Sequence, residues 1–379
     1  MRALQHPGVS GKAERSAGQA RKEGTAAMEK YIGCDSHQRY SVFVTMDEKG
    51  EAGVPVRVEH SGGELRKFLG TLPPGAPVAV EASGGWYWFV DALEQAGLEP
   101  HLANPLEAKK QMPGRKKTDK PDARGLATLL RVGTLPEVWI PPAKLRDLRG
   151  LMRTRLSMRQ QGTFLKNRIH AAIRRYGLRQ DAFAGLFSGK ARITLSGYID
   201  SLPDHTRFAT TQEWEMLNQL ERHIDRLEVR IREGICKLGW VRLLKTLPGV
   251  GDILGATIHL EIGDVNRFPA PPHLAAYAGL VPSVHSSGGK THYGPTSAQA
   301  NHYLKWAFVE AANAIVMHRD KYSEQHVGQL YQRLKERKCH GKAATAVARH
   351  LAESSWWILK KKQEYRAPHA AAMSSSRNG

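Results

Sequence analysis

Four carboxylates stand where a fold could gather them around divalent cations: Asp35, Glu81, Asp119 and Asp122. Asp35 and Glu81 each close an apolar run that predicts a buried strand, where a carboxylate is costly unless a cation compensates it. Asp119 and Asp122 are three residues apart at a predicted helix start, so they share one face. Such oxygen ligands suit Mg²⁺, and two ions held together can bracket an in-line attack on a phosphate.

Each acid also has an ordinary structural interpretation, which is preferred when the acid is taken alone. Asp35 suits a turn, Glu81 a capping group and Asp119 a helix N-cap. Their joint arrangement favours the metal site. The acids follow the first and a later strand and lie on a final helix, in the order strand, hairpin, strand, helix, strand, helix. That order is typical of the RNase H/RuvC-like nuclease fold.

Residues 29–143 are predicted to form the mixed α/β domain that positions these acids, because their apolar residues recur at strand and helix spacings. The predicted elements are strands at 31–35, 40–45, 54–58, 78–82 and 98–103, helices at 63–72 and 86–96, a basic loop at 109–117, and a helix from Asp119.

The middle of the chain, residues 144–239, is predicted to be helical. Its arginine-rich segment 145–175 predicts a surface for a DNA or RNA backbone. Later apolar residues recur at spacings of three and four, close to a heptad seam. They are Leu217, Leu220, Ile224, Leu227, Ile231, Ile235 and Leu238. The seam indicates either one helix of a globular bundle or a coiled coil between protomers.

Residues 240–365 are predicted to form a mostly α-helical C-terminal domain. A turn at 247–251 opens a helix at 252–262, a Gly- and Ser-rich loop covers 277–296, and helices resume from Asn301. The turn is similar to half of a helix-hairpin-helix, whose backbone N–H groups approach phosphates. A simple packing turn between two helices is an equally good interpretation.

The charge balance indicates a nucleic-acid partner. The 379 residues hold 56 Lys and Arg against 36 Asp and Glu, a formal net charge of +20. The alternative is a merely soluble basic surface. No apolar run approaches the roughly 18 residues of a membrane span, which predicts no membrane contact. Three scattered cysteines fit a reducing cytoplasm. Residues 1–28 and 366–379 read as disordered, and either Met1 or Met28 could be the start.

Several segments resemble, in order, the blocks of the DEDD insertion-sequence transposases, the family of bridge-RNA-guided recombinases. Those of the first domain are residues 32–35 (IGCD), 80–84 (VEASG) and 117–123 (KTDKPDA). Those of the C-terminal domain are residues 247–251 (LPGVG), 275–282 (AAYAGLVP), 286–290 (SSGGK) and 301–313 (NHYLKWAFVEAAN). The resemblance covers residues 29–360.

The resemblance implies a DNA transposase that cuts and rejoins strands with Mg²⁺, two ions being expected. The acidic quartet carries over onto Asp35, Glu81, Asp119 and Asp122, and the catalytic serine onto Ser287, with Ser286 as a one-residue ambiguity. It further implies element ends and target DNA as substrates, a non-coding guide RNA, and a homo-oligomer, dimer or tetramer. The expected location is the bacterial cytoplasm, at the nucleoid.

The chain departs from the family pattern beside the predicted loop. Gly294-Pro295 and Gln299-Ala300 stand where relatives carry arginine, lysine and glycine, so we expect a weaker nucleic-acid contact there. Two other functions fit the same residues. One is a RuvC-like endonuclease that activates water and has no need of Ser287. The other is a non-catalytic nucleic-acid-binding protein whose acids are structural.

Overall fold

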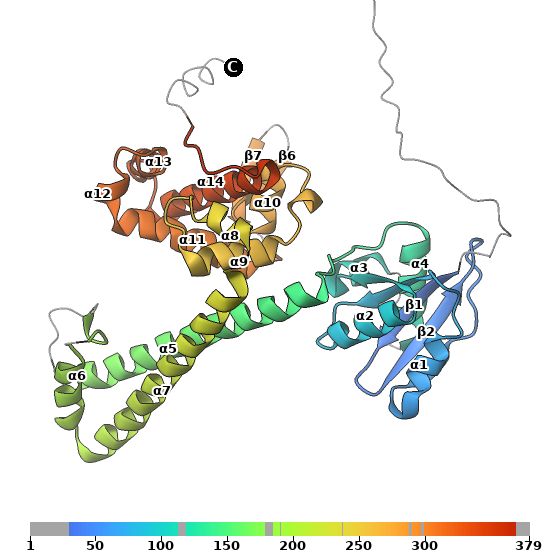
Figure 1. The fold of residues 1–379 in the computed structure, drawn as a ribbon, viewed down its shortest axis with the longest axis horizontal. Helices are drawn as coiled ribbons and strands as arrows, with labels where there is room; N and C mark the ends of the chain where they lie inside the picture. The colour runs from blue at the N-terminus through green and yellow to red at the C-terminus, as the bar shows by residue number, and fades with distance from the viewer. Residues whose placement is uncertain are drawn as a thin grey trace, which may run out of the picture. The chain divides into compact units, whose positions relative to one another are not determined.

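A mixed sheet organises the first part of the chain, and helices build most of the rest. In this computed structural model the chain divides between Ile140 and Pro141 into an N-terminal and a C-terminal unit (Figure 1). The structure describes residues 30–112, 119–178, 185–189, 191–236, 238–287, 290–296 and 299–368. Side chains are not described for 119–121, 284–287 and 290–293. The predicted disordered segment 1–28 and the tail from 369 onward lie outside the described residues.

Five strands form the sheet of the N-terminal unit, in the order β3-β2-β1-β4-β5. They are β1 (Tyr31–Ser36), β2 (Tyr40–Met46), β3 (Val56–Glu59), β4 (Pro77–Glu81) and β5 (Glu99–Ala103). β1 pairs with β2 antiparallel and with β4 parallel, and β4 pairs with β5 parallel. A mixed α/β N-terminal region was predicted, and it is confirmed.

Helices cover both faces of this sheet. They are η1 (Ser61–Gly63), α1 (Glu64–Leu69), α2 (Trp86–Gln95), α3 (Pro105–Gln111) and α4 (Asp119–Arg131). Successive side chains of a strand point to opposite faces. On β1 and β4, Ile32, Cys34, Val78 and Val80 therefore pack with residues of α1 and α2. Ala79, one residue along, packs on the other face with α4.

Helix α4 approaches the sheet most closely at Gly33 of β1. A Cβ added to Gly33 would lie 1.8 Å from the carbonyl oxygen of Ala123 and 2.6 Å from the backbone nitrogen of Ala127. The helix backbone thus rests directly on the strand backbone, which only glycine permits. The contact sets the position of every residue in the first turns of α4.

The predicted basic loop at 109–117 is wrong in its first part, because Lys109 and Lys110 lie in α3. The Asn104 side chain caps this helix by accepting hydrogen bonds from the backbone N–H groups of Leu106 and Glu107, and proline follows at the first helical position. Residues 113–117 of the predicted loop lie outside the described residues.

Two long helices form an antiparallel pair within the C-terminal unit (Figure 1). These are α5 (Ala143–Arg175) and α7 (Asp204–Ile235), joined through α6 (Ala191–Asp200). The heptad residues of α7 face α5: Leu217 packs with Leu165 and Ile169, and Ile231 packs with Met152. Of the two interpretations of the seam, packing inside one chain accounts for these residues.

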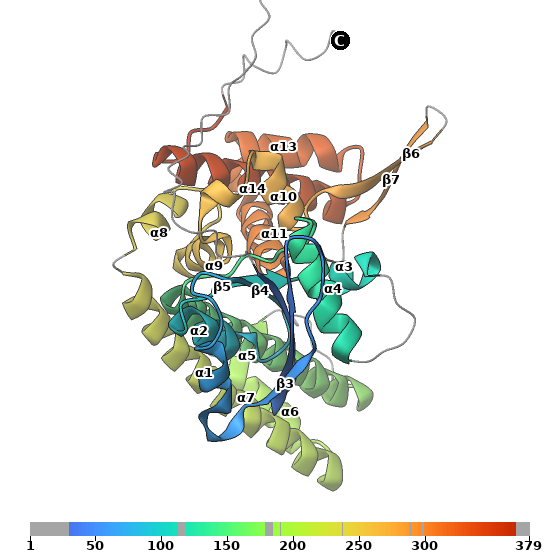
Figure 2. The same cartoon turned by 90° about the vertical axis from the view of Figure 1, so that its right-hand side faces the viewer.

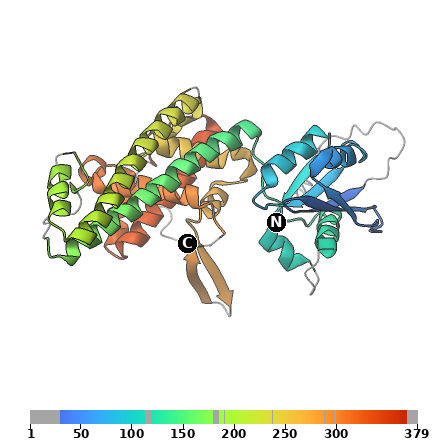
Figure 3. The ribbon, with the colours of Figure 1, turned by 90° about the horizontal axis from the view of Figure 1, so that it is seen from below.

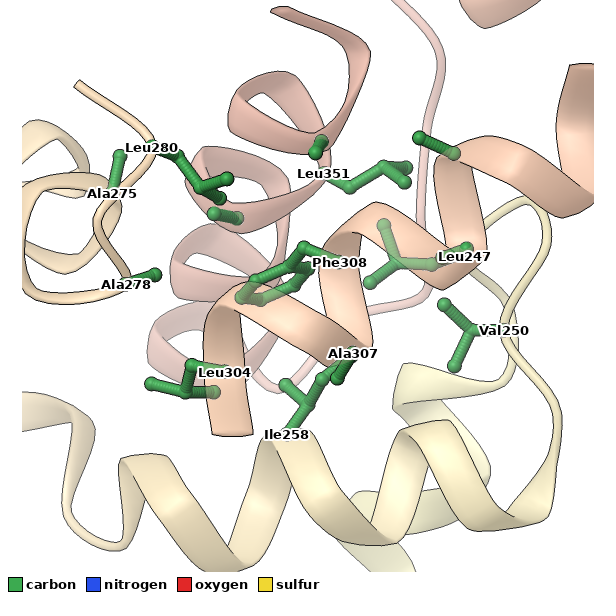
Figure 4. Close-up of a cluster of buried hydrophobic side chains, with 14 of the residues drawn as sticks. Leu247, Val250, Ile258, Ala275, Ala278, Leu280, Leu304, Ala307, Phe308 and Leu351 are labelled. Carbon is green, nitrogen blue, oxygen red and sulfur yellow. The ribbon is translucent and has the colours of Figure 1, made fainter. Parts of the chain in front are cut away.

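Short helices and one long helix enclose the C-terminal core. They are α8 (Gly239–Leu244), α9 (Asp252–Ile262), η3 (Val265–Arg267), α10 (Pro271–Tyr277), α11 (His302–Met317), α12 (Arg319–Tyr322), α13 (His326–Lys335) and α14 (His340–Lys361). Phe308 of α11 is fully buried among Leu247, Ile258, Leu280 and other apolar side chains (Figure 4). The mostly helical C-terminal part was predicted and is confirmed.

The predicted loop at 277–296 is wrong, because most of it is a β-hairpin. β6 (Pro282–Ser287) pairs antiparallel with β7 (Lys290–Thr296), with Ser287 opposite Lys290. Figures 2 and 3 show the hairpin projecting from the helices of its unit. The sequence carried a signal for this, since a Gly-Gly pair between two short segments is typical of a hairpin turn. Gly288 and Gly289 themselves lie outside the described residues.

None of the helices in the described part of the chain combines the length and hydrophobicity that a membrane crossing requires.

The contact at Gly33 generates a stability prediction. We expect Gly33→Ala to lower the free energy of unfolding by at least about 3 kcal/mol, because two packed backbones must separate to admit the methyl group. The matched control is Gly70→Ala, where the added Cβ meets its nearest neighbours at 3.5 Å and φ is −66°. Urea unfolding followed by circular dichroism measures both. Equal stability of the two variants would contradict the close approach.

Candidate active site

The parallel register of β1 and β4 brings Asp35 and Glu81 together. Cys34 is paired with Val80, so Asp35 and Glu81 are the next residues on neighbouring strands. Because side chains alternate along a strand, Asp35 shares a sheet face with Gly33, and Glu81 shares a face with Ala79. This is the face that carries α4. Asp35 is largely buried, with 17% of its side chain exposed. The two carboxylates therefore share one edge and one face of the sheet.

Asp122 joins this pair from helix α4. Burial raises the pKa of Glu81 above its ordinary value, and the negative charges of Asp35 and Asp122 raise it further. The positive charge of Lys109 lowers the pKa of Glu81. Asp122 precedes Ala123, whose carbonyl oxygen lies on Gly33, so the close contact of α4 with β1 explains its position. The structure thus brings three of the four predicted acids into one electrostatic cluster.

The fourth acid, Asp119, begins α4, and its side chain lies outside the described residues. Among the side chains that are described, no three of His, Cys, Asp and Glu are close enough together to ligate one metal ion. The fit to a cation rests on charge. Burial raises the pKa of Glu81, the charges of Asp35 and Asp122 raise it further, and Lys109 opposes them only in part. A divalent cation is the group that relieves such an excess of negative charge.

Two residues near the cluster were missed by the sequence reasoning. The His37 Nε2 atom lies 3.2 Å from Oδ2 of Asp35, and its ring packs on Tyr40 with centroids 4.5 Å apart. Lys109 was assigned to a loop, yet it lies on α3 close enough to act on Glu81. The Asn104-Pro105 cap could have placed Lys109 on a helix, whereas only the tertiary fold brings it to the acids.

The candidate nucleophile Ser287 is the last residue of β6, and Ser286 precedes it. Neither side chain is among those described, so the structure gives their backbone position alone. In the backbone register Ser286 is opposite Thr291 and Ser287 is opposite Lys290.

The predicted nucleic-acid surface on 145–175 is wrong for several of its arginines. Arg146, Arg149 and Arg155 are buried. Arg149 donates a 2.6 Å hydrogen bond to Glu261 of α9, and Arg155 donates one of 2.6 Å to Glu228 of α7. Buried guanidinium groups need such partners. Arg149 and Arg155 thus hold helices together, and none of the three buried arginines is available to a phosphate backbone.

Glu261 is the centre of a buried polar network in the C-terminal unit. Its carboxylate is 2% exposed and accepts hydrogen bonds from Arg149, Arg153 and Asn301, at 2.6 to 2.9 Å. Burial alone would raise the pKa of Glu261, but the hydrogen bonds and charges of Arg153 and Arg149 lower it to about 2. An acid in the last turn of the apolar helix 252–262 was the signal that sequence reasoning overlooked.

Asn301 links this network to the segments that resemble the transposase blocks. Its side-chain oxygen caps α11 by accepting from the N–H groups of Tyr303 and Leu304. Its amide nitrogen donates to Glu261 at 2.9 Å and to the Tyr277 hydroxyl at 3.3 Å. Two of the C-terminal blocks therefore meet at the partly buried amide of Asn301.

The turn at 247–251 packs closely against another helix. Gly249 has φ +76°, and a Cβ added there would lie 2.3 Å from the carbonyl oxygen of Ala311 in α11. Its N–H group donates to the Tyr322 hydroxyl at 3.3 Å. The glycine thus serves helix packing, which favours the packing interpretation over a phosphate-binding half-motif at this residue.

Two family models match the chain. The model described as "Transposase IS116/IS110/IS902 family" matches residues 241–327, within the C-terminal unit. The DEDD model of the IS110 type, described as "Transposase", matches residues 32–177, from β1 into the end of α5. The three acids of the cluster lie inside the second match, and Ser287 lies inside the first.

Curated relatives agree with these matches over most of the chain. The transposase for insertion sequence element IS1111A of Coxiella burnetii is 25% identical, over 89% of this chain and 91% of the relative. A probable family 20 transposase of Pseudomonas aeruginosa is 24% identical, over 80% and 89%. The pilin gene-inverting protein of Moraxella lacunata is 30% identical, over 56% and 58%.

The Glu261 network generates a prediction about stability and pH. We expect Glu261→Gln to lower the free energy of unfolding by about 3–5 kcal/mol near neutral pH, because Arg149 stays buried without its counter-charge. The folded pKa is depressed, so this stabilisation is present above about pH 4.5 and is lost as the pH falls toward about 2.

Urea unfolding across that pH range measures the effect. The difference in the free energy of unfolding between the unchanged protein and Glu261→Gln should become smaller as the pH falls. The exposed, paired Glu233 supplies the control, and Glu233→Gln should change stability by no more than about 0.5 kcal/mol. If this difference in the free energy of unfolding did not change with pH, the charge of Glu261 would contribute nothing to stability.

Proposed function

We propose that this chain, an insertion-sequence transposase of the IS110/IS116 family, cuts DNA at the acidic cluster of its N-terminal unit and rejoins it through Ser287. The observation that carries the proposal is the convergence of Asp35, Glu81 and Asp122, from two strands and a helix, on one face of the sheet. The strand order β3-β2-β1-β4-β5, with one antiparallel hairpin followed by parallel pairs, supports an RNase H/RuvC-like domain.

The three clustered acids, together with Asp119, would hold Mg²⁺, and two ions are proposed. Bound there, magnesium supplies positive charge to the scissile phosphate and to the oxygen that leaves it. The protein contributes rigidity, because Asp35 and Glu81 stand on paired strands and Asp122 on a helix locked against them. His37 would orient Asp35 through their 3.2 Å contact.

The nucleophile in this proposal is the Ser287 hydroxyl. Its Oγ forms a bond to phosphorus while the bond from phosphorus to a deoxyribose oxygen breaks. The serine proton is released, and the departing sugar oxygen takes up a proton. Reversal of these steps with another DNA end restores the backbone and frees the serine, so no high-energy cofactor is consumed. A relative named as a gene-inverting protein supports rejoining, since inversion needs both cutting and joining.

The proposal extends to partners. The net charge of +20 supports binding of DNA at the element ends and the target. Guide RNA pairing would supply base recognition, and a homo-oligomer would bring two DNA ends together; both rest on the resemblance described above. A second candidate is a RuvC-like endonuclease that uses water. It is favoured by the containment of the acidic cluster within the N-terminal unit.

Removal of magnesium tests the acidic cluster. A raised carboxyl pKa means that ionised Glu81 destabilises the fold as the pH rises through that pKa. We therefore expect Glu81→Gln to raise the unfolding temperature in EDTA at neutral pH. In the unchanged protein MgCl₂ should raise the unfolding temperature, since ligand at about ten times its Kd adds roughly 1.4 kcal/mol. Glu81→Gln should lose this response.

Thermal unfolding in EDTA and in MgCl₂ measures both effects, with Glu94→Gln on the exposed face of α2 as the matched control. The control should respond to magnesium as the unchanged protein does. A magnesium response that survives Glu81→Gln would remove Glu81 from the proposed site.

Trapping of a covalent adduct tests the nucleophile. The substrate is a labelled plasmid carrying the element's two ends and its flanking non-coding DNA, with the transcript of that DNA added. We expect a denaturation-resistant protein–DNA adduct that Ser287→Ala abolishes and the matched Ser286→Ala retains. Asp122→Asn should reduce cleavage by at least about a hundredfold. Cleavage that continues in Ser287→Ala without any adduct would instead support the water-using endonuclease.

A further inference from the structure

Three consecutive lysines at the end of α14 each lie over a different tryptophan ring. The Nζ atom of Lys361 lies 4.6 Å from the ring centre of Trp357, and that of Lys360 lies 5.9 Å from Trp356. Lys362 reaches Trp240 of α8 at 5.7 Å. The segment is at the red end of the ribbon in Figure 1. Cations and aromatic faces are thus brought together in a small region of the C-terminal unit.

The chain that leaves α14 is held in place by specific contacts. Lys362 has φ +55°, and it is the one non-glycine residue with positive φ in the described part of the chain. Such a conformation persists where surrounding contacts determine it. Here the Tyr365 N–H donates to the Thr246 hydroxyl at 2.8 Å, and the Tyr365 hydroxyl contacts His350 at 3.2 Å. Tyr365 therefore holds the segment that follows α14 against residues Thr246 and His350.

A cavity of about 400 Å³ opens on this surface. Its lining includes Trp357, Lys361, Tyr365 and Arg366. Trp357 is 48% exposed, so the indole ring is accessible to a ligand. Two acids also line the cavity: Glu353, whose carboxylate is paired with Arg349 at 2.8 Å, and the exposed Glu364. The volume lies within the range of ordinary ligand sites.

These features match one class of ligand. An unpaired nucleotide offers a flat base for stacking on an aromatic ring and a phosphate for a nearby cation. Bases in a duplex are already stacked and cannot reach such a ring. The helix dipole explains why lysines near a helix C-terminus are favourable. It does not explain Arg366, beyond the helix, or an indole left half exposed beside it.

We propose that this surface binds single-stranded nucleic acid, with a base stacked on Trp357 and the adjoining phosphates on Lys361 and Arg366. The inference builds on the proposed function, because a transposase that opens DNA or uses a guide RNA exposes unpaired strands. The surface involves none of the acids of the candidate active site, so binding and cleavage are separable.

Fluorescence anisotropy of the full-length protein in EDTA tests the proposal. The probes are labelled oligo(dT) and oligo(U) of about 20 nucleotides and a duplex of equal length. We expect Trp357→Ala to weaken single-strand binding by about tenfold and Trp357→Tyr to restore most of it. Duplex binding should be unchanged. The two oligonucleotides distinguish DNA from RNA as the preferred strand. Phe208→Ala, on a 69% exposed ring of α7, is the matched control.

Two further measurements show whether the oligonucleotide binds at this surface or elsewhere on this basic chain. Photocrosslinking of an oligonucleotide carrying halogenated uracil should label the peptide that contains Trp357 and Tyr365. Lys361→Gln should lower the dependence of single-strand affinity on salt by about one phosphate contact. Unchanged affinity and an unchanged crosslink map in Trp357→Ala would overturn the proposal.

The outcomes separate this inference from the proposed function. Intact cleavage together with unaltered single-strand binding in Trp357→Ala would refute only the surface. Loss of single-strand binding in Trp357→Ala, in a chain that forms no adduct and cuts no DNA, would refute only the transposase chemistry. Unfolding curves of Trp357→Ala and Lys361→Gln show that both variants are folded.

Discussion

The contact between helix α4 and strand β1 is the constraint on which the N-terminal unit depends. At Gly33 the two backbones touch, and no side chain fits between them. Because the helix cannot move away, Asp122 is held beside the carboxylates that the parallel register of β1 and β4 places on the same face. One glycine therefore determines whether three acids form a cluster or remain apart. Burial of Glu81, and next to it the charges of Asp35 and Asp122, raise the pKa of its carboxyl above the ordinary value.

The electrostatics of the C-terminal unit are the opposite, because its buried carboxylate is surrounded by cations. Its central carboxylate, Glu261, is compensated by Arg149 and Arg153 from α5 and by the Asn301 amide, so its pKa is depressed to about 2. A buried acid paired with arginines holds helices together, whereas a cluster of acids that nearby cations compensate only in part is suited to recruit a cation. The same comparison applies to α5, where the buried Arg149 and Arg155 are paired with acids of other helices.

Particular residues show how far sequence reasoning reaches. Asp35, Glu81 and Asp122 could be selected because their positions relative to strands and a helix are local properties. Lys109 and Asn301 could not, because their roles come from partners far along the chain. His37 was missed although its partner Asp35 is only two residues away. The hairpin of β6 and β7 was missed although its Gly-Gly pair was visible, since the glycine and serine content favoured a loop.

The sequence by itself determined the chain order of the five strands of the N-terminal sheet, the split into a mixed α/β part and a helical part, and the family resemblance, because each depends on short-range patterns. Only the tertiary structure decided which faces meet. The seam of α7 was satisfied by α5 of the same chain, and arginines that suggested a phosphate surface turned inward toward Glu261 and Glu228. The physical reason is that burial and ion pairing depend on both surfaces that meet. The periodicity of a sequence segment describes only the surface of that segment.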